Sequence, residues 1–164
     1  MTTVYVSVGS NVDPADNIRR GIDCLQREYG QILLSPVYRT RAVGFDGDDF
    51  LNLAASFETN DSVQDVDRTL DEIENECGRD RREARFGPRT LDLDLLLYGD
   101  LVLDEPGLRL PRDEILEYAF VLRPLADLAP GLIHPTTGNS LAELWAARTD
   151  QADPLIPVPF VLQP

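Results

Sequence analysis

Segments in which every second residue is apolar are interspersed with segments in which apolar residues recur at helical spacing. This order constrains the fold more than any other feature of the chain. Alternation marks a strand with one buried face, and spacings of three and four mark an amphipathic helix. The expected strands cover residues 4–8, 32–40, 50–59 and 91–98, and the expected helices cover residues 14–29 and 63–77. The order β-α-β-β-α-β predicts a ferredoxin-like α+β core with a mostly antiparallel sheet and helices packed on it.

Smaller elements are expected after this core. A hairpin around Pro106-Gly107 is followed by extra C-terminal helices near residues 112–116, 119–128 and 140–147. Residues 150–164 contain four prolines, so we expect an extended tail that forms at most an edge strand. With 164 residues, the chain is long enough to bury one core, and we expect a single domain over residues 1–164.

Local signals predict where the first helix begins and ends. Asp13 is expected to cap its N-terminus, with Pro14 as the first helical residue and Gly30 just after its end. In the strand over residues 32–40, Pro36 predicts an edge position or a bulge.

The composition excludes several classes of site and partner. The net charge of −14 argues against nucleic acid, because a phosphate backbone requires a basic surface. The chain has no run of about 18 apolar residues and no signal-peptide pattern, so we expect no membrane span and a cytoplasmic location. A single histidine, His134, and two cysteines without CxxC spacing argue against a zinc site. All 15 basic residues are arginine, which excludes a P-loop lysine and a Schiff-base lysine.

Two aspartates interrupt the apolar strand over residues 91–98. Asp92 and Asp94 are expected on one face, about 7 Å apart, while the four leucines from Leu91 to Leu97 at odd positions face the core. Aspartate is a poor strand former, and like charges this close repel each other unless a cation lies between them. Carboxylates with no nearby histidine or cysteine suit magnesium. The alternative is a solvated strand face with two ordinary aspartates.

Positive charge is concentrated in the loop before this strand. Residues 79–89 carry five arginines, with Gly78 before them and Gly87-Pro88 among them. Guanidinium groups bind phosphate in a bidentate way, and glycines allow a loop to close over a ligand. A solvated loop with local ion pairs is the alternative. Next to two aspartates, the loop favours a magnesium–triphosphate site.

These segments resemble the hydroxymethyl-dihydropterin pyrophosphokinase family of folate biosynthesis. The resemblance is carried by Arg79-x-Arg81 and by the block Arg85-Phe86-Gly87-Pro88-Arg89-Thr90-Leu91-Asp92-Leu93-Asp94. It continues, in the family order, through Gly9-Ser10-Asn11, Tyr38-Arg39-Thr40, Asp49-Phe50-Leu51-Asn52, Ile73-Glu74 and Phe120-Val121-Leu122-Arg123-Pro124-Leu125. It covers nearly the whole chain and is weakest in the C-terminal tail.

The resemblance implies an enzyme that transfers a pyrophosphoryl group from ATP to the hydroxymethyl group of 6-hydroxymethyl-7,8-dihydropterin and releases AMP. Two magnesium ions bound with ATP would be held by Asp92 and Asp94. Arg79 and Arg89 would contact the phosphates as catalytic residues. Arg81 and Glu74 would lie beside the nucleotide.

The same resemblance implies a pterin site. Asn52 would hold the ring, Phe50 and Phe120 would stack on it, and the segment from Thr40 to Gly44 would close the pocket. The alternative for the two phenylalanines is a place in the core, whereas a buried Asn52 requires hydrogen-bond partners. The expected partners are ATP and a dihydropterin, and the expected state is a monomer or weak homodimer.

Three positions depart from the family pattern. Arg112 follows Pro111 where a histidine that contacts ATP is usual, Tyr118 takes the place of an arginine, and Phe86 takes the place of a tryptophan. Arg112 is still expected to contact ATP, whereas Tyr118 supplies no positive charge. The alternative function is therefore a divergent member that binds a pterin or nucleotide, or acts on a different pterin, with little of the usual activity.

Overall fold

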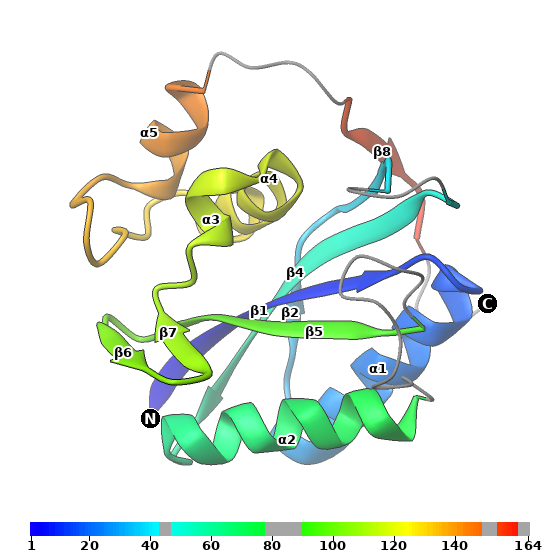
Figure 1. Ribbon diagram of the computed structural model, residues 1–164, viewed down its shortest axis with the longest axis horizontal. Coiled ribbons are helices and arrows are strands. Elements are labelled where there is room, and N and C mark those ends of the chain that lie inside the picture. Colours follow the sequence, from blue (N-terminus) through cyan, green and yellow to red (C-terminus); the bar gives the residue numbers. More distant parts are fainter. Residues whose placement is uncertain (43–46, 78–89, 149–153, 161–164) are drawn as a thin grey trace.

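One antiparallel sheet forms the centre of the protein (Figure 1). The computed structural model describes residues 1–42, 47–77, 90–148 and 154–160. The strand order is β5-β1-β4-β3-β8, and β2 pairs with another part of β4. The strands of this sheet are β1 (Thr2–Ser10), β2 (Leu33–Leu34), β3 (Val37–Thr40), β4 (Phe50–Thr59), β5 (Asp92–Tyr98) and β8 (Ile156–Val158). All pairings between the described strands are antiparallel, which confirms the expected sheet.

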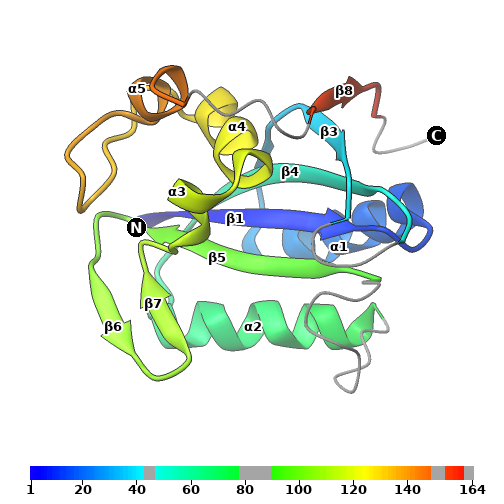
Figure 2. The same cartoon turned by 45° about the horizontal axis from the view of Figure 1, so that its top comes forward.

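Helices cover both faces of this sheet (Figures 1 and 2). One face carries α1 (Pro14–Tyr29) and α2 (Val63–Glu76), and the other carries α3 (Glu114–Glu117), α4 (Ala119–Leu128) and α5 (Leu141–Ala146). The hairpin of β6 (Leu103–Glu105) and β7 (Leu108–Leu110) follows β5. The ferredoxin-like α+β core and the extra C-terminal helices are therefore confirmed. The longest described helix has 16 residues, and no described helix has the length and hydropathy needed to cross a membrane.

The expected strand over residues 32–40 is divided in two. Between β2 and β3, the Ser35 N–H donates to the Ala54 carbonyl oxygen (2.9 Å), and Ser35 Oγ accepts from the Ala54 N–H (2.8 Å). The serine side chain thus maintains the pairing next to Pro36, which has no N–H to donate. On the other side of β3, the tail contributes β8 as an edge strand.

The sheet has a hydrophobic core on each face: the first packs against α1 and α2, and the second packs against α3, α4 and α5. A change of register on β5 alters which of its side chains lie in each core. Tyr5 pairs with Leu97, whereas Val6 pairs with Leu95, so Leu96 is an extra residue in β5. The leucines before this point pack with α1 and α2, as predicted. Leu96 and Leu97 both lie in the second core, under α3 and α4. The prediction for Leu97 is wrong because an extra residue inverts the alternation of a strand.

The start of α1 also differs from the expectation. Asp13 has the left-handed conformation (φ 40°, ψ 55°), and its side chain makes no capping hydrogen bond. Its carbonyl oxygen accepts the first hydrogen bond of the helix, from the Asn17 N–H at 3.0 Å. Pro14 is the first helical residue, and Gly30 follows the helix with φ 80°, both as predicted.

The buried side chain of His134 holds the turn before α5. Its Nδ1 atom accepts from the backbone N–H groups of Thr136 and Thr137, both at 3.3 Å. Burial lowers the pKa of this imidazole, which favours the neutral ring that can accept these bonds. His134 therefore has a structural role in this part of the chain.

At Gly21, α1 approaches the side chain of Leu91, the residue before β5, very closely. A Cβ atom at Gly21 would lie 2.7 Å from Cδ2 of Leu91, and Leu91 is fully buried. The core around Leu91 therefore has no room for a methyl group at this point of α1.

We expect Gly21→Ala to lower the free energy of unfolding by about 1–3 kcal/mol, because the added methyl group overpacks the core. Helix propensity alone predicts the opposite sign, a gain of up to about 1 kcal/mol. Urea denaturation measures the change. Gly131→Ala is the control, because its Cβ atom meets no atom within 4 Å. Equal effects of the two substitutions would contradict the packing argument.

Candidate functional site

Three carboxylates from two elements meet beside the edge of the sheet. Glu74 comes from the last turn of α2, and Asp92 and Asp94 come from the first residues of β5. Each side chain offers one oxygen, and these oxygens all lie within 4.8 Å of one another. The expected pair of aspartates thus shares one face, and the structure adds Glu74 to it.

Glu74 is held in this position by the backbone of β5. Its Oε1 atom accepts from the Leu93 N–H at 2.7 Å, and the residue is 2% exposed. Because β5 is the edge strand, the Leu93 amide is available to a side chain from α2. Glu74 occupies the position four residues after the buried Leu70, on the apolar stripe of α2. A charged residue on an apolar stripe is the sequence signal for this role of Glu74. The family resemblance implied only a position beside the nucleotide.

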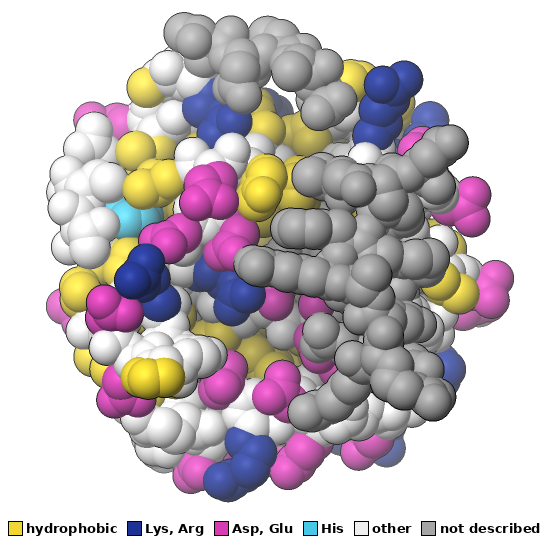
Figure 3. All heavy atoms as spheres, in the orientation of Figure 1, with side chains coloured by type: hydrophobic (Ala, Val, Ile, Leu, Met, Phe, Trp, Pro, Cys, Tyr) yellow, Lys and Arg dark blue, Asp and Glu magenta, His cyan; other side chains and the backbone are white. Residues whose placement is uncertain are grey.

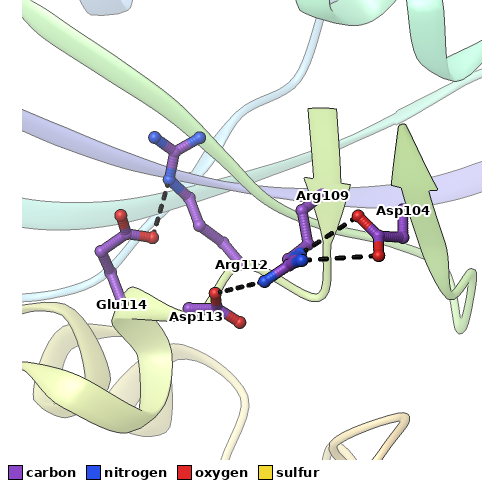
Figure 4. A network of polar contacts seen from close by, with 5 residues as sticks. All are labelled: Asp104, Arg109, Arg112, Asp113 and Glu114. Carbon is purple, nitrogen blue, oxygen red and sulfur yellow. Dashed lines mark hydrogen bonds and ion pairs between the residues drawn. The ribbon is translucent and has the colours of Figure 1, made fainter. Parts of the chain in front are cut away.

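Arg112 approaches the cluster from the segment that follows the hairpin. Its Nη2 atom lies 3.4 Å from Oδ1 of Asp94, and its Nε atom lies 3.0 Å from Oε2 of Glu114 (Figure 4). Burial lowers the pKa of Arg112, but the charges of Asp94, Glu114 and Asp92 outweigh this and raise it. The guanidinium is therefore a fixed positive charge beside the carboxylates. Sequence reasoning missed Glu114, which lies two residues after Arg112.

The expected phosphate-binding arginines of the segment 79–89 lie outside the described residues. This applies to Arg79, Arg81 and Arg89, and also to Gly44 of the expected pterin site. In the described residues, acidic and basic side chains gather on the face between α3 and α2 (Figure 3).

Asn52 and Thr40 form a buried polar pair on the other side of β1. The Asn52 Nδ2 atom donates to Thr40 Oγ1 at 2.7 Å, and both residues are 5% exposed. Gly9 on β1 pairs with Asn52 of β4 on one side and with Asp92 of β5 on the other. Two antiparallel pairings place Asn52 and Asp92 roughly 10 Å apart across the sheet. The structure thus brings the expected pterin and metal residues to neighbouring positions.

Ser10 and Asn11, which follow Gly9, connect the end of β1 to the beginnings of β5 and β4. Ser10 Oγ donates to the carbonyl oxygen of Thr90, just before β5, at 2.6 Å. Asn11 Nδ2 donates to the carbonyl oxygen of Asp48, just before β4, at 3.1 Å. These bonds fix the ends of β4 and β5 relative to β1.

The two expected stacking rings are half-buried. Phe50 begins β4, and Phe120 lies in the first turn of α4, at the edge of the second core. Phe120 stacks on Tyr118 with ring centroids 5.0 Å apart and an interplanar angle of 27°. Tyr118 therefore provides an aromatic contact at the position where the resemblance led us to expect a cation.

Comparison with known sequences identifies the family. The family model described as 7,8-dihydro-6-hydroxymethylpterin-pyrophosphokinase (HPPK) matches residues 5–130, which include Asn52 and the three carboxylates. The chain belongs to the HPPK family. Similar relatives include the 2-amino-4-hydroxy-6-hydroxymethyldihydropteridine pyrophosphokinases of Pseudomonas aeruginosa and Aquifex aeolicus. The first is 44% identical over 148 residues (88% of this chain and 90% of the relative), and the second is 34% identical over 151 residues (91% and 94%).

Solved HPPK structures have the same fold. The wild-type HPPK-DHPS of Plasmodium falciparum with STZ-DHP superposes with a TM-score of 0.65 at 12% sequence identity. A second HPPK-DHPS crystal structure, in complex with substrates, gives a TM-score of 0.71 at 11% identity. The present chain spans 41% and 43% of those two longer chains, and at this identity the likeness shows the fold alone.

We expect Gly9→Ala to disturb Asn52, because a Cβ atom at position 9 would lie 2.8 Å from Asn52 Oδ1. The free energy of unfolding should fall by about 1–3 kcal/mol. A double-mutant cycle with Asn52→Ala tests the cause: without the amide, the cost of Gly9→Ala should shrink by on the order of 1 kcal/mol. Urea denaturation measures the change in the free energy of unfolding. If Gly9→Ala lowers it equally with Asn52 and with Asn52→Ala, the strain does not come from contact with the Asn52 amide.

Proposed function

We propose that this protein transfers a pyrophosphoryl group from ATP to the hydroxymethyl group of 6-hydroxymethyl-7,8-dihydropterin, giving AMP, in folate biosynthesis. The observation that carries the proposal is the cluster of Glu74, Asp92 and Asp94 in a member of the HPPK family. The Pseudomonas aeruginosa relative, whose printed name states the pyrophosphokinase activity, aligns over 90% of its length.

The carboxylate cluster fits magnesium. Its donors are oxygen atoms only, and magnesium commonly takes one or two carboxylates together with substrate phosphates. Asp92 and Asp94 would hold two magnesium ions, and Glu74 adds a third negative charge. The ions would neutralise charge on the triphosphate when bound. The hydrogen bond from the Leu93 amide keeps the Glu74 carboxylate oriented toward the cluster before ATP binds.

The phosphate contacts are assigned to arginines. Arg79, Arg81 and Arg89 take these roles on the basis of the family resemblance, and Arg112 is the described arginine that lies close to the cluster. A guanidinium forms bidentate hydrogen bonds with phosphate oxygens and stays charged.

The pterin is assigned to the β4 side of Gly9, opposite the β5 side that carries the carboxylate cluster. Thr40 fixes the Asn52 amide by a hydrogen bond, so the amide can present a defined edge to the polar edge of a pterin ring. Phe50 and Phe120 are both half-buried aromatic residues, and they are proposed to stack on the ring. The two subsites then lie on neighbouring strands, which suits transfer between two bound substrates.

Three wider expectations from the sequence stay predictions. These are a single domain over residues 1–164, a monomer or weak homodimer, and a cytoplasmic location.

We expect the purified protein to form AMP from ATP and 6-hydroxymethyl-7,8-dihydropterin in the presence of Mg²⁺. Asp94→Asn should lower kcat/KM by on the order of 100-fold, because it removes one charged metal ligand. Asp100→Asn is the matched control on an exposed turn after β5, and its kcat/KM should stay within about twofold of the unchanged protein. Chromatographic quantification of AMP measures all three. Binding of both substrates without AMP formation would instead support a divergent binding protein.

A further inference from the structure

The position of Arg112 is fixed by both its backbone and its side chain. Its N–H donates to the Leu96 carbonyl oxygen at 3.0 Å, which ties it to β5 two residues beyond Asp94. The guanidinium then lies between Asp94 and Glu114, with the Arg112 side chain 35% exposed. The backbone bond to β5 and the side-chain contact with Asp94 together hold the arginine beside the acidic cluster.

The charges around Arg112 are mostly negative. Asp94, Glu114 and Asp92 raise its pKa against the effect of burial. Asp67 on α2 also interacts electrostatically with it: burial and Asp71 raise the pKa of Asp67, and the charge of Arg112 opposes that rise. Arg112 is thus a positive charge that several carboxylates share.

Arg109 provides a contrast within the same segment. It binds Asp104 and Asp113 on the exposed side of the hairpin, through contacts of 3.1 to 3.4 Å (Figure 4). Its ion pairs in the described residues are with these two aspartates, not with the acidic cluster. The two arginines therefore differ in their partners although they lie three residues apart.

We propose that Arg112 is an internal counter-cation of the Asp92–Asp94 site before substrates bind, and that it makes the site select a metal–nucleotide complex over the free metal ion. This inference rests on the proposed function. A divalent cation that binds Asp94 without a nucleotide is repelled by the Arg112 guanidinium, whose Nη2 atom lies 3.4 Å from Asp94 Oδ1. A polyphosphate brings oxygen acceptors with the metal, so the guanidinium can exchange the carboxylate for a phosphate.

Two features of the structure make this exchange physically reasonable. The contact between Arg112 and Asp94 is longer than the 2.7–2.9 Å typical of a strong charge-assisted hydrogen bond, so little is lost when it breaks. Arg112 also lines a cavity of about 210 Å³ together with residues of the hairpin and His134, so protein atoms do not fill all the space around it.

The test compares metal binding with and without nucleotide in the full chain. Free Mn²⁺ is measured by electron paramagnetic resonance in titrations of the unchanged protein, Arg112→Gln and Arg109→Gln. The two variants make the same change in net charge. In the absence of nucleotide, Arg112→Gln should bind Mn²⁺ about 10-fold more tightly than the unchanged protein, and Arg109→Gln should stay within about twofold. With a non-hydrolysable ATP analogue, Arg112→Gln should bind the Mn²⁺–analogue complex about 10-fold more weakly.

The outcomes separate this role from the proposed function. If all three proteins bind Mn²⁺ alone equally while the unchanged protein forms AMP, the role of Arg112 is rejected and the proposed function stands. If none of them binds Mn²⁺ even with the analogue, both are rejected. Circular dichroism checks that the variants fold. Arg112→Met, which keeps an apolar stem without the charge, replaces Arg112→Gln if that variant unfolds, with the same expected affinities.

Discussion

The hydrogen bond from the Leu93 amide to Glu74 connects the fold to the candidate site. It joins the last turn of α2 to the edge strand β5 and fixes a buried carboxylate beside two more. A buried carboxylate is costly unless hydrogen bonds or opposite charges compensate for it, so this contact also stabilises the negative charge of Glu74. The position of α2 against the sheet and the geometry of the acidic cluster therefore depend on each other.

The proposed reaction requires a chain of net charge −14 to bind ATP, which is itself strongly negative. Positive charge near the site offsets the repulsion between them. Arg112 balances the carboxylates from one side, and the arginines of residues 79–89 belong to the segment just before β5. Gly9 separates this charged half from the buried pair of Asn52 and Thr40. The glycine at this point of the central strand leaves the space over β1 that the Asn52 amide occupies.

Much of this could be predicted from periodicity. The alternation of leucine and aspartate correctly gave a strand with two acidic residues on one face, and the helical stripes gave α1 and α2. The extra residue at Leu96 could not be predicted, because a bulge depends on pairing with Tyr5 and Val6 rather than on the sequence of β5 itself. The same holds for Asp13, which precedes the helix with a left-handed backbone and makes no side-chain cap. A charge on the apolar stripe of α2 marks Glu74 as unusual, but its place beside Asp92 and Asp94 depends on how α2 packs against β5, which the sequence does not show.

The most direct test of the central claim is a crystal structure with Mn²⁺ and a non-hydrolysable ATP analogue, in which anomalous scattering locates the metal. The account predicts Mn²⁺ at about 2.1 Å from carboxylate oxygens of Asp92 and Asp94, with Glu74 still bound to the Leu93 amide. Metal ions located away from these aspartates, or an analogue bound without metal at this edge of the sheet, would contradict it.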